Sequence, residues 1–237
     1  MQKNRINILS TRPLNESIID EAAQQNIFID CISFIETEPV KTLELNEKLE
    51  QLSSKNIEVV FTSMNAVDAV KDHLRFKPNW KIFSIGQTTK ELIKDFFGEE
   101  SVVGTADDAS QLADVIIQHH PQEVFFFCGD QRRDEMPQKL NEAGIALEEI
   151  VVYKTTSTSK KLNKDYEGIL FFSPSAVDSF FTTNTIADDT IVFAIGNTTA
   201  TAVNERVNNK IVIADKPGKE ELVKKMLAYL SPEKQKN

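Results

Sequence analysis

The stretch Ala194–Thr199 (AIGNTT) and its near-copy Ser84–Thr89 (SIGQTT) decide how the chain folds. Each hexapeptide closes an apolar run and opens a run with helical periodicity, which is the pattern of a strand followed by a helix. Glycine and small polar residues leave the first amides of that helix uncovered, and such amides attract anions together with the helix dipole. The sequence therefore predicts an α/β protein that holds an anionic ligand at these turns.

The two hexapeptides belong to a longer internal repeat in which residue 84 aligns with residue 194, an offset of 110. At the same offset, Ser63–Asp68 (SMNAVD) matches Ser173–Asp178 (SPSAVD), and Val102–Val103 matches Val212–Ile213. One offset thus serves three consecutive strand-helix units, which a chance alignment of generic patterns does not explain. A duplication of half of the chain is the best explanation.

Composition narrows the class of protein. The 237 residues are 41% hydrophobic, which is ample for packed cores, and the duplication favours two small domains over one. A net charge of -9 disfavours broad contacts with nucleic acid or with an anionic membrane, although one pocket can still be positive. The N-terminus lacks the apolar core of a signal peptide, and no apolar run approaches membrane-spanning length.

The two cysteines, Cys31 and Cys128, are too few for a disulfide framework and lie outside any Cys-x-x-Cys pair. A reducing cytoplasm fits this usage.

Continuous apolar runs mark the strands. The clearest is Val124–Phe127 (VFFF), which is typical of a parallel strand covered by helices on both faces. Predicted strands span 6–10, 27–35, 57–61, 81–85, 101–103, 123–128, 147–153 and 168–172, and predicted helices include 40–53, 88–97, 108–119 and 132–143. Glu36–Pro39 is predicted to break a strand, and the polar Lys154–Lys161 (KTTSTSKK) is predicted to be a linker.

A second internal match predicts the domain arrangement. Residues 27–37 resemble residues 145–155 at an offset of 118, so the two repeats are circularly shifted. The simplest arrangement has a discontinuous five-stranded domain of residues 1–35 and 160–237, an inserted domain of residues 40–152, and connectors at 36–39 and 153–159. We expect the connectors to run side by side and the strand ends to face a cleft, since open parallel sheets bind ligands at that edge.

The candidate ligand contacts all lie at predicted strand-to-helix turns. They are Thr11, Arg12, Thr62, Ser63, Thr88, Thr89, Gly129, Arg132, Ser173, Ser175, Gly196, Asn197, Thr198 and Thr199. Taken singly, each Ser, Thr or Asn is also an ordinary helix N-cap, and the two arginines are either forks for carboxylates or surface ion pairs. The edge that these residues share favours binding.

No metal and no cofactor are predicted. His73, His119 and His120 lie on or after predicted helices without a partner at ligand spacing, so they are interpreted as solvated histidines. The sequence has no Walker-type loop, no Gly-x-Gly-x-x-Gly and no Gly-x-Ser-x-Gly, which disfavours nucleotide cofactors and triad hydrolysis.

Over nearly its whole length the chain resembles the uroporphyrinogen-III synthase family. The motifs that carry the resemblance are Leu9–Pro13 (LSTRP), Phe61–Ser63 (FTS), Val151–Tyr153 (VVY), Phe172–Val177 (FSPSAV) and Ala194–Thr199 (AIGNTT). Each motif is short, and their order and spacing are the specific signal. One departure is Gly129–Arg133 (GDQRR), where many members of the family have a more glycine-rich turn.

The resemblance implies two flavodoxin-like domains joined by a two-stranded connector. It also implies cofactor-free closure of hydroxymethylbilane to uroporphyrinogen III in tetrapyrrole (haem) biosynthesis, with loss of water and inversion of the last ring through a spiro intermediate. The many carboxylates of that substrate suit helix amides with a few Ser, Thr and Arg groups. We expect a monomer without nucleic-acid or membrane partners, in at most transient contact with the enzyme that makes hydroxymethylbilane.

Tyr153 is the candidate catalytic residue, because it ends the strand residues Ile150–Val152 where the chain leaves one predicted domain for the other. Its phenol could help the substrate hydroxyl depart, and the alternative is an amphipathic residue packed at the hinge. Two other functions stay open at this point. One is a non-catalytic two-domain protein that binds an anion or small ligand, and the other is a tandem receiver-like regulator, which the lack of acidic clusters at the strand ends disfavours.

Overall fold

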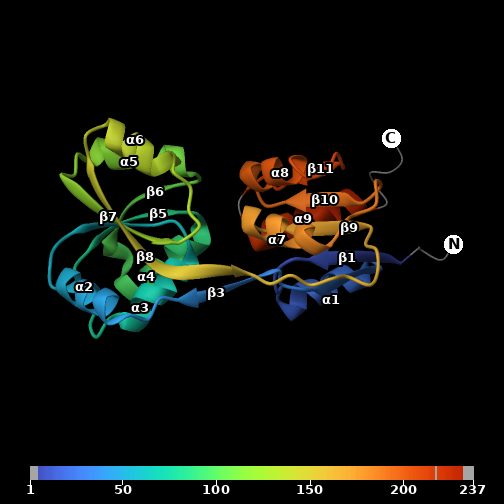
Figure 1. Cartoon of the computed structure of the whole chain (residues 1–237), viewed down its shortest axis with the longest axis horizontal. Coiled ribbons are helices and arrows are strands. Elements are labelled where there is room, and N and C mark those ends of the chain that lie inside the picture. The colour runs from blue at the N-terminus through green and yellow to red at the C-terminus, as the bar shows by residue number, and fades with distance from the viewer. Residues whose placement is uncertain (1–4, 217, 232–237) are drawn as a thin grey trace. The chain divides into compact units, whose positions relative to one another are not determined.

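The computed structural model of the chain describes residues 5–216 and 218–231. These residues form two compact units (Figure 1). Unit 1 combines the described residues up to Glu36 with those from Thr156 onward, and unit 2 is Thr37–Thr155. Each unit is a sheet with helices on both faces, as expected for parallel strands that are apolar on both sides.

Unit 1 holds a five-stranded parallel sheet in the order β11-β10-β9-β1-β2. The strands are β1 (Ile6–Ser10), β2 (Ile27–Cys31), β9 (Gly168–Phe171), β10 (Ile191–Ala194) and β11 (Ile211–Ile213), and the helices are α1 (Glu16–Gln24), α7 (Pro174–Thr183), α8 (Asn197–Asn204) and α9 (Lys219–Leu230). Ala22 of α1 and Met226 of α9 are buried in the core on one face, while Phe180 of α7 and Val203 of α8 are buried on the other. Numbered within the unit, the strand order is the flavodoxin-like 2-1-3-4-5.

Unit 2 holds a six-stranded sheet in the order β3-β8-β7-β4-β5-β6. The strands are β3 (Ile35–Pro39), β4 (Glu58–Phe61), β5 (Lys81–Ile85), β6 (Val102–Ala106), β7 (Glu123–Gly129) and β8 (Ala146–Ser157), and the helices are α2 (Leu43–Ser53), α3 (Met64–His73), α4 (Gln87–Phe97), α5 (Ala109–His119) and α6 (Glu135–Glu142), with a short 3-10 turn at Glu99–Ser101. Helices α5 and α6 cover one face of the sheet, and α2, α3 and α4 cover the other (Figure 1).

The five parallel strands of unit 2 repeat the strand order of unit 1 with the chain shifted circularly. Strand β9 begins 110 residues after β4 and α7 begins 110 residues after α3, whereas β7 and β8 take the places of β1 and β2. The predicted fold class, two flavodoxin-like α/β domains with parallel sheets, is confirmed. The second sheet carries one further edge strand, β3, which runs antiparallel to β8: Val40 N donates to Val152 O, and Thr158 N donates to Phe34 O.

Some predicted boundaries were wrong. The single strand predicted over 27–35 is two strands, β2 and β3, and Glu36–Pro39 lies inside β3 instead of breaking a strand. Residues 154–157, predicted to begin a linker, extend β8. The paired β3 and β8 segments are bonded through their backbones with mostly exposed side chains, so they need no apolar pattern. The helix predicted from residue 132 begins at Glu135, and the helix predicted from residue 40 begins at Leu43, where Thr42 caps it.

Candidate active site at the carboxyl ends of the strands

In unit 2, Tyr153 in the second half of β8 meets the amino end of α3 through a hydrogen bond between two hydroxyl groups. Ser63 is the N-cap of α3, and its Oγ accepts a hydrogen bond from Ala66 N at 3.2 Å. The same hydroxyl donates to Tyr153 Oη at 3.1 Å. One hydroxyl therefore connects the Tyr153 phenol to the positive end of the α3 dipole, and this arrangement favours negative charge on the phenol oxygen.

The turn after β7 is tied to β8. Asp130 N donates to Tyr153 O at 3.1 Å, and Asp130 Oδ1 accepts from Thr155 N at 2.9 Å. Arg132, predicted to bind a substrate carboxylate, forms ion pairs with Asp134 and Glu149 of its own unit. The turn is thus bonded to the second half of β8, and Arg132 is already paired with two carboxylates.

The helices that follow the repeated turns differ in how their amino ends are capped. Ser63 caps α3 and Ser173 caps α7, each accepting from the amide three residues on. No side-chain hydrogen bond caps α4 at Gly86 or α8 at Gly196. Among these four helices, the two without a side-chain cap follow the hexapeptides AIGNTT and SIGQTT, and α1, α6 and α9 lack such a cap as well.

The threonines at these turns divide into surface and buried groups. Thr88, Asn197 and Thr198 lie on the surface or partly so, in the first turns of α4 and α8. Thr89 and Thr199, one residue further along each helix, are buried. Only the first group can offer its side chain to a ligand.

Thr11 is fully committed to the fold of unit 1. It is buried, and both its backbone N and its Oγ1 donate to Leu170 O, at 3.0 and 2.8 Å. Of the remaining predicted contacts, Thr62 and Ser175 are partly buried after β4 and at the start of α7.

Unit 1 places two cations together. Arg12, after β1, lies close enough to Lys219, the first residue of α9, for its charge to act on the lysine: burial and then the charge of Arg12 lower the pKa of Lys219. Across the described residues, no carboxylate forms an ion pair with either side chain. The sequence interpretation missed Lys219, although a strand-helix turn at Gly218-Lys219 follows the repeat match at Val212–Ile213.

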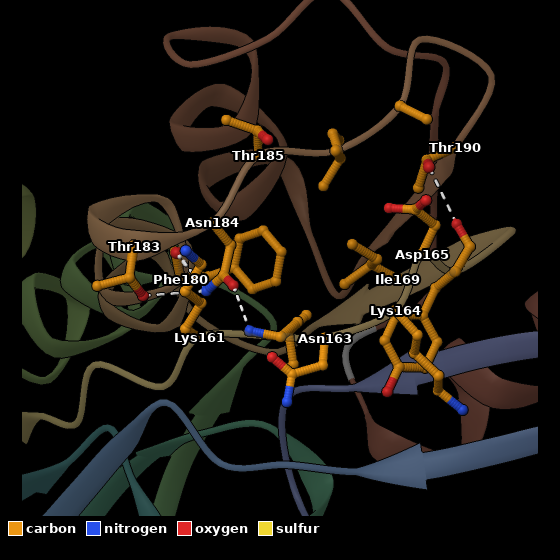
Figure 2. A pocket seen from close by; sticks show the side chains of 14 residues that line it. Lys161, Asn163, Lys164, Asp165, Ile169, Phe180, Thr183, Asn184, Thr185 and Thr190 are labelled. Atoms are coloured by element: carbon orange, nitrogen blue, oxygen red, sulfur yellow. Dashed lines mark hydrogen bonds between the residues drawn. The ribbon is translucent and has the colours of Figure 1, made fainter.

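A cavity of about 280 Å³ lies elsewhere in unit 1, at the amino end of β9 and the carboxyl end of α7 (Figure 2). Its wall is held by internal hydrogen bonds: Asn184 Oδ1 accepts from Leu162 N, and Thr190 Oγ1 donates to Tyr166 O. These bonds join the loop before β9 to the loops around it. The cavity is at the opposite edge of the sheet from the candidate contacts, and the side chains of Asn184 and Thr190 in its wall are engaged in bonds that hold the fold.

Neither cysteine is disulfide-bonded. Burial, followed by the charge of Glu149, raises the pKa of the Cys128 thiol to about 11, so this thiol is inert at neutral pH. Within residues 5–216 and 218–231, no group of three or more His, Cys, Asp or Glu side chains is arranged to hold a metal ion. No helix in that part of the chain has the length and apolarity to cross a membrane.

The fold and the turns define a class of protein: two flavodoxin-like units, each with a helix that begins after glycine without a side-chain cap. The chain belongs to the uroporphyrinogen-III synthase family, because the model of that family, described as uroporphyrinogen-III synthase HemD, matches residues 19–224. The chain is also 35% identical over 88 residues to the uroporphyrinogen-III synthase of Saccharomyces cerevisiae. That match covers 33% of this chain and spans 32% of the length of the yeast protein.

Solved structures show the same fold. A mutant uroporphyrinogen III synthase of the extremely thermophilic bacterium Thermus thermophilus is similar with a TM-score of 0.63 and 13% identity, over 94% of this chain and 97% of that chain. The uroporphyrinogen-III synthetase of Helicobacter pylori is similar with a TM-score of 0.65 and 17% identity, over 94% of this chain and 99% of that chain.

Proposed function

We propose that the protein is a uroporphyrinogen-III synthase, a cyclising lyase that closes hydroxymethylbilane to uroporphyrinogen III with loss of water and inversion of the last pyrrole ring. Membership of the family supports this activity. The single observation that carries it is the twinned turn: α4 in unit 2 and α8 in unit 1 both begin after glycine without a side-chain cap. A linear tetrapyrrole has carboxylates along its length, and uncapped helix amides of this kind are suited to binding carboxylates.

In this proposal the first amides of α4 and α8 bind substrate carboxylates, with Thr88, Asn197 and Thr198 beside them. Arg12 and Lys219 supply positive charge in unit 1. Thr62 and Ser175 contribute from the other two turns. Arg132, Thr11, Thr89 and Thr199 take structural roles, because each is paired or buried.

Tyr153 assists the departure of the substrate hydroxyl. The C–O bond breaks as the pyrrole electrons stabilise the carbocation, and the phenol passes its proton to the departing oxygen as the bond breaks, so that the oxygen leaves as water. The cation is attacked at the substituted carbon of the last ring, and the resulting spiro intermediate fragments and recloses with that ring inverted. The proton released when the ring regains aromaticity replaces the one that left with the water. The donation from Ser63 Oγ offsets the charge that develops on the phenol oxygen.

The test is to supply hydroxymethylbilane and resolve the product isomers. Spontaneous closure gives the isomer in which the last ring is not inverted, so the inverted isomer reports the enzyme. A predominance of the inverted isomer is the expected result. Only the uninverted isomer, formed at the spontaneous rate, would refute the activity and would favour a protein that binds its anion without turnover.

We further propose that the enzyme acts as a monomer in the cytoplasm and meets the enzyme that makes hydroxymethylbilane only transiently. The two free thiols support a reducing compartment. Light scattering across a range of concentrations tests the monomer.

A further inference from the structure

The ladder between β7 and β8 is irregular at the active-site end. The first six residues of β7 pair one to one with the first six of β8, but Gly129 then pairs with Tyr153, so that Val152 is an extra residue on β8. An extra residue of this kind turns the following side chains to the other face of the strand. Regular alternation would have placed Tyr153 on the α5–α6 side of the sheet.

The burial of side chains along β8 is consistent with this change of face. Ile150 and Val152 are buried in the core that includes Phe61 and Val67, on the side of α2, α3 and α4. Tyr153, the very next residue, packs against the same core. The irregularity therefore turns the phenol toward Ser63 at the amino end of α3.

Gly129 provides the space for the tyrosine ring. A Cβ at position 129 would lie 2.5 Å from Tyr153 Cζ, 2.7 Å from Cε2 and 2.8 Å from Oη, all closer than a real Cβ approaches another heavy atom. The backbone of Gly129 is outside the positive-φ region, so it is the ring and not the backbone conformation that requires glycine here. Any residue with a side chain at this position must displace the phenol.

We infer that Gly129 and Ser63 are positioning residues for the reaction, acting through Tyr153. The backbone carbonyl of Tyr153 is held by Asp130 N, its ring rests on Gly129, and its hydroxyl is held by Ser63. The inference rests on the proposed function, in which this phenol assists the leaving hydroxyl. It gives a different role to two residues that the sequence pattern predicted as substrate contacts.

The first test is the Gly129→Ala variant. Tyr153→Phe, which keeps the ring and deletes the donor, should lower kcat about 10²-fold. We expect a similar fall for Gly129→Ala with KM unchanged, since the reacting group moves while the binding turns stay in place. In a Tyr153→Ala background the ring is gone, so Gly129→Ala should cause no further loss. Ser63→Ala should lower kcat about tenfold, and Ser63→Thr, which keeps the hydroxyl, should restore it. Multiplicative losses for Gly129→Ala and Tyr153→Ala would overturn the inference.

Gly104→Ala is the matched control for crowding. Gly104 lies on β6, the fourth strand along the sheet from β8. A Cβ at this residue would lie 2.7 Å from Phe83 Cδ1 and 2.7 Å from Val115 Cγ1. This variant crowds the core of the same unit by a similar margin but leaves Tyr153 alone. It should lower Tm without changing kcat. A loss of kcat equal to that of Gly129→Ala would assign both effects to general strain and contradict the inference.

A readout independent of turnover separates this inference from the proposed function. The chain has three tyrosines, so 3-fluorotyrosine labelling gives few ¹⁹F resonances, and Tyr153→Phe identifies the one of interest. Gly129→Ala should shift that resonance and leave those of Tyr166 and Tyr229 unchanged. An unshifted resonance overturns the positioning role. A shifted resonance in a protein whose wild type makes no inverted isomer supports the positioning contact and refutes the proposed reaction instead.

Discussion

Ser84→Ala should stabilise unit 2. Ser84 is fully buried on β5, and its Oγ has no hydrogen-bond partner among the described residues. A buried hydroxyl without a partner costs about 1–3 kcal/mol of desolvation. Removing the Ser84 oxygen loses only a few van der Waals contacts, each worth about 0.1–0.2 kcal/mol. The net gain should be about 1 kcal/mol, or a rise in Tm of about 4 °C for a unit of this size.

The internal repeat supplies the reciprocal experiment. Ala194 occupies the corresponding position on β10 of unit 1 and is also fully buried. Ala194→Ser should therefore destabilise unit 1 by a similar amount, because it adds the same hydroxyl to a matching site. Calorimetry of both variants measures the two shifts. A lower Tm for Ser84→Ala would refute the argument, since it would mean that the hydroxyl is satisfied by a buried water molecule.

Three further predictions concern the candidate contacts and the acid side of the stability curve. Arg12→Ala and Lys219→Ala should each raise KM for hydroxymethylbilane about tenfold with kcat unchanged, and a fall in kcat alone would contradict a binding role. Thr198→Ala should lower kcat/KM by less than about tenfold, because the backbone amides of the helix also bind the substrate carboxylate. Abolished turnover in a folded variant would rule out such shared binding. The hydrogen bond from Lys164 is the largest of the effects that lower the pKa of Asp30. The pair therefore stabilises the folded state above about pH 4, and this stabilisation is lost as the pH falls through the lowered pKa. Urea midpoints between pH 2 and 6 should accordingly show a smaller acid-side loss for Asp30→Asn than for the wild type.

The repeated turns and the buried strands were readable from the sequence because each is a local pattern. The offset between Ser84–Thr89 and Ala194–Thr199 predicted two equivalent strand-helix turns, and both are present. The apolar run Val124–Phe127 predicted a strand that is covered on both faces, and β7 is buried in this way.

Other features depend on partners that no local pattern reveals. Arg132 pairs with Glu149 of β8 as well as with nearby Asp134, and its pairing with the distant Glu149 is not visible in the local sequence. The irregular register at Gly129 depends on how β7 pairs with β8, so it cannot be predicted from the sequence of either strand alone. Residues 154–157 lie in a strand because their backbone finds a partner in the chain, while their side chains carry no strand signal.

The circular shift of the two units has a consequence for synthesis on the ribosome. Unit 2 is one continuous segment, so its strands can pair as soon as β8 has emerged. Strand β1 lies in the interior of the unit 1 sheet, and its neighbour β9 is made more than a hundred residues after β2. At a translation rate of roughly 5–20 residues per second, the apolar strands of the nascent β1–α1–β2 segment stay uncovered for on the order of 10 s until β9 is made. Unit 1 is thus the part of the nascent chain most exposed to chaperones and to misfolding.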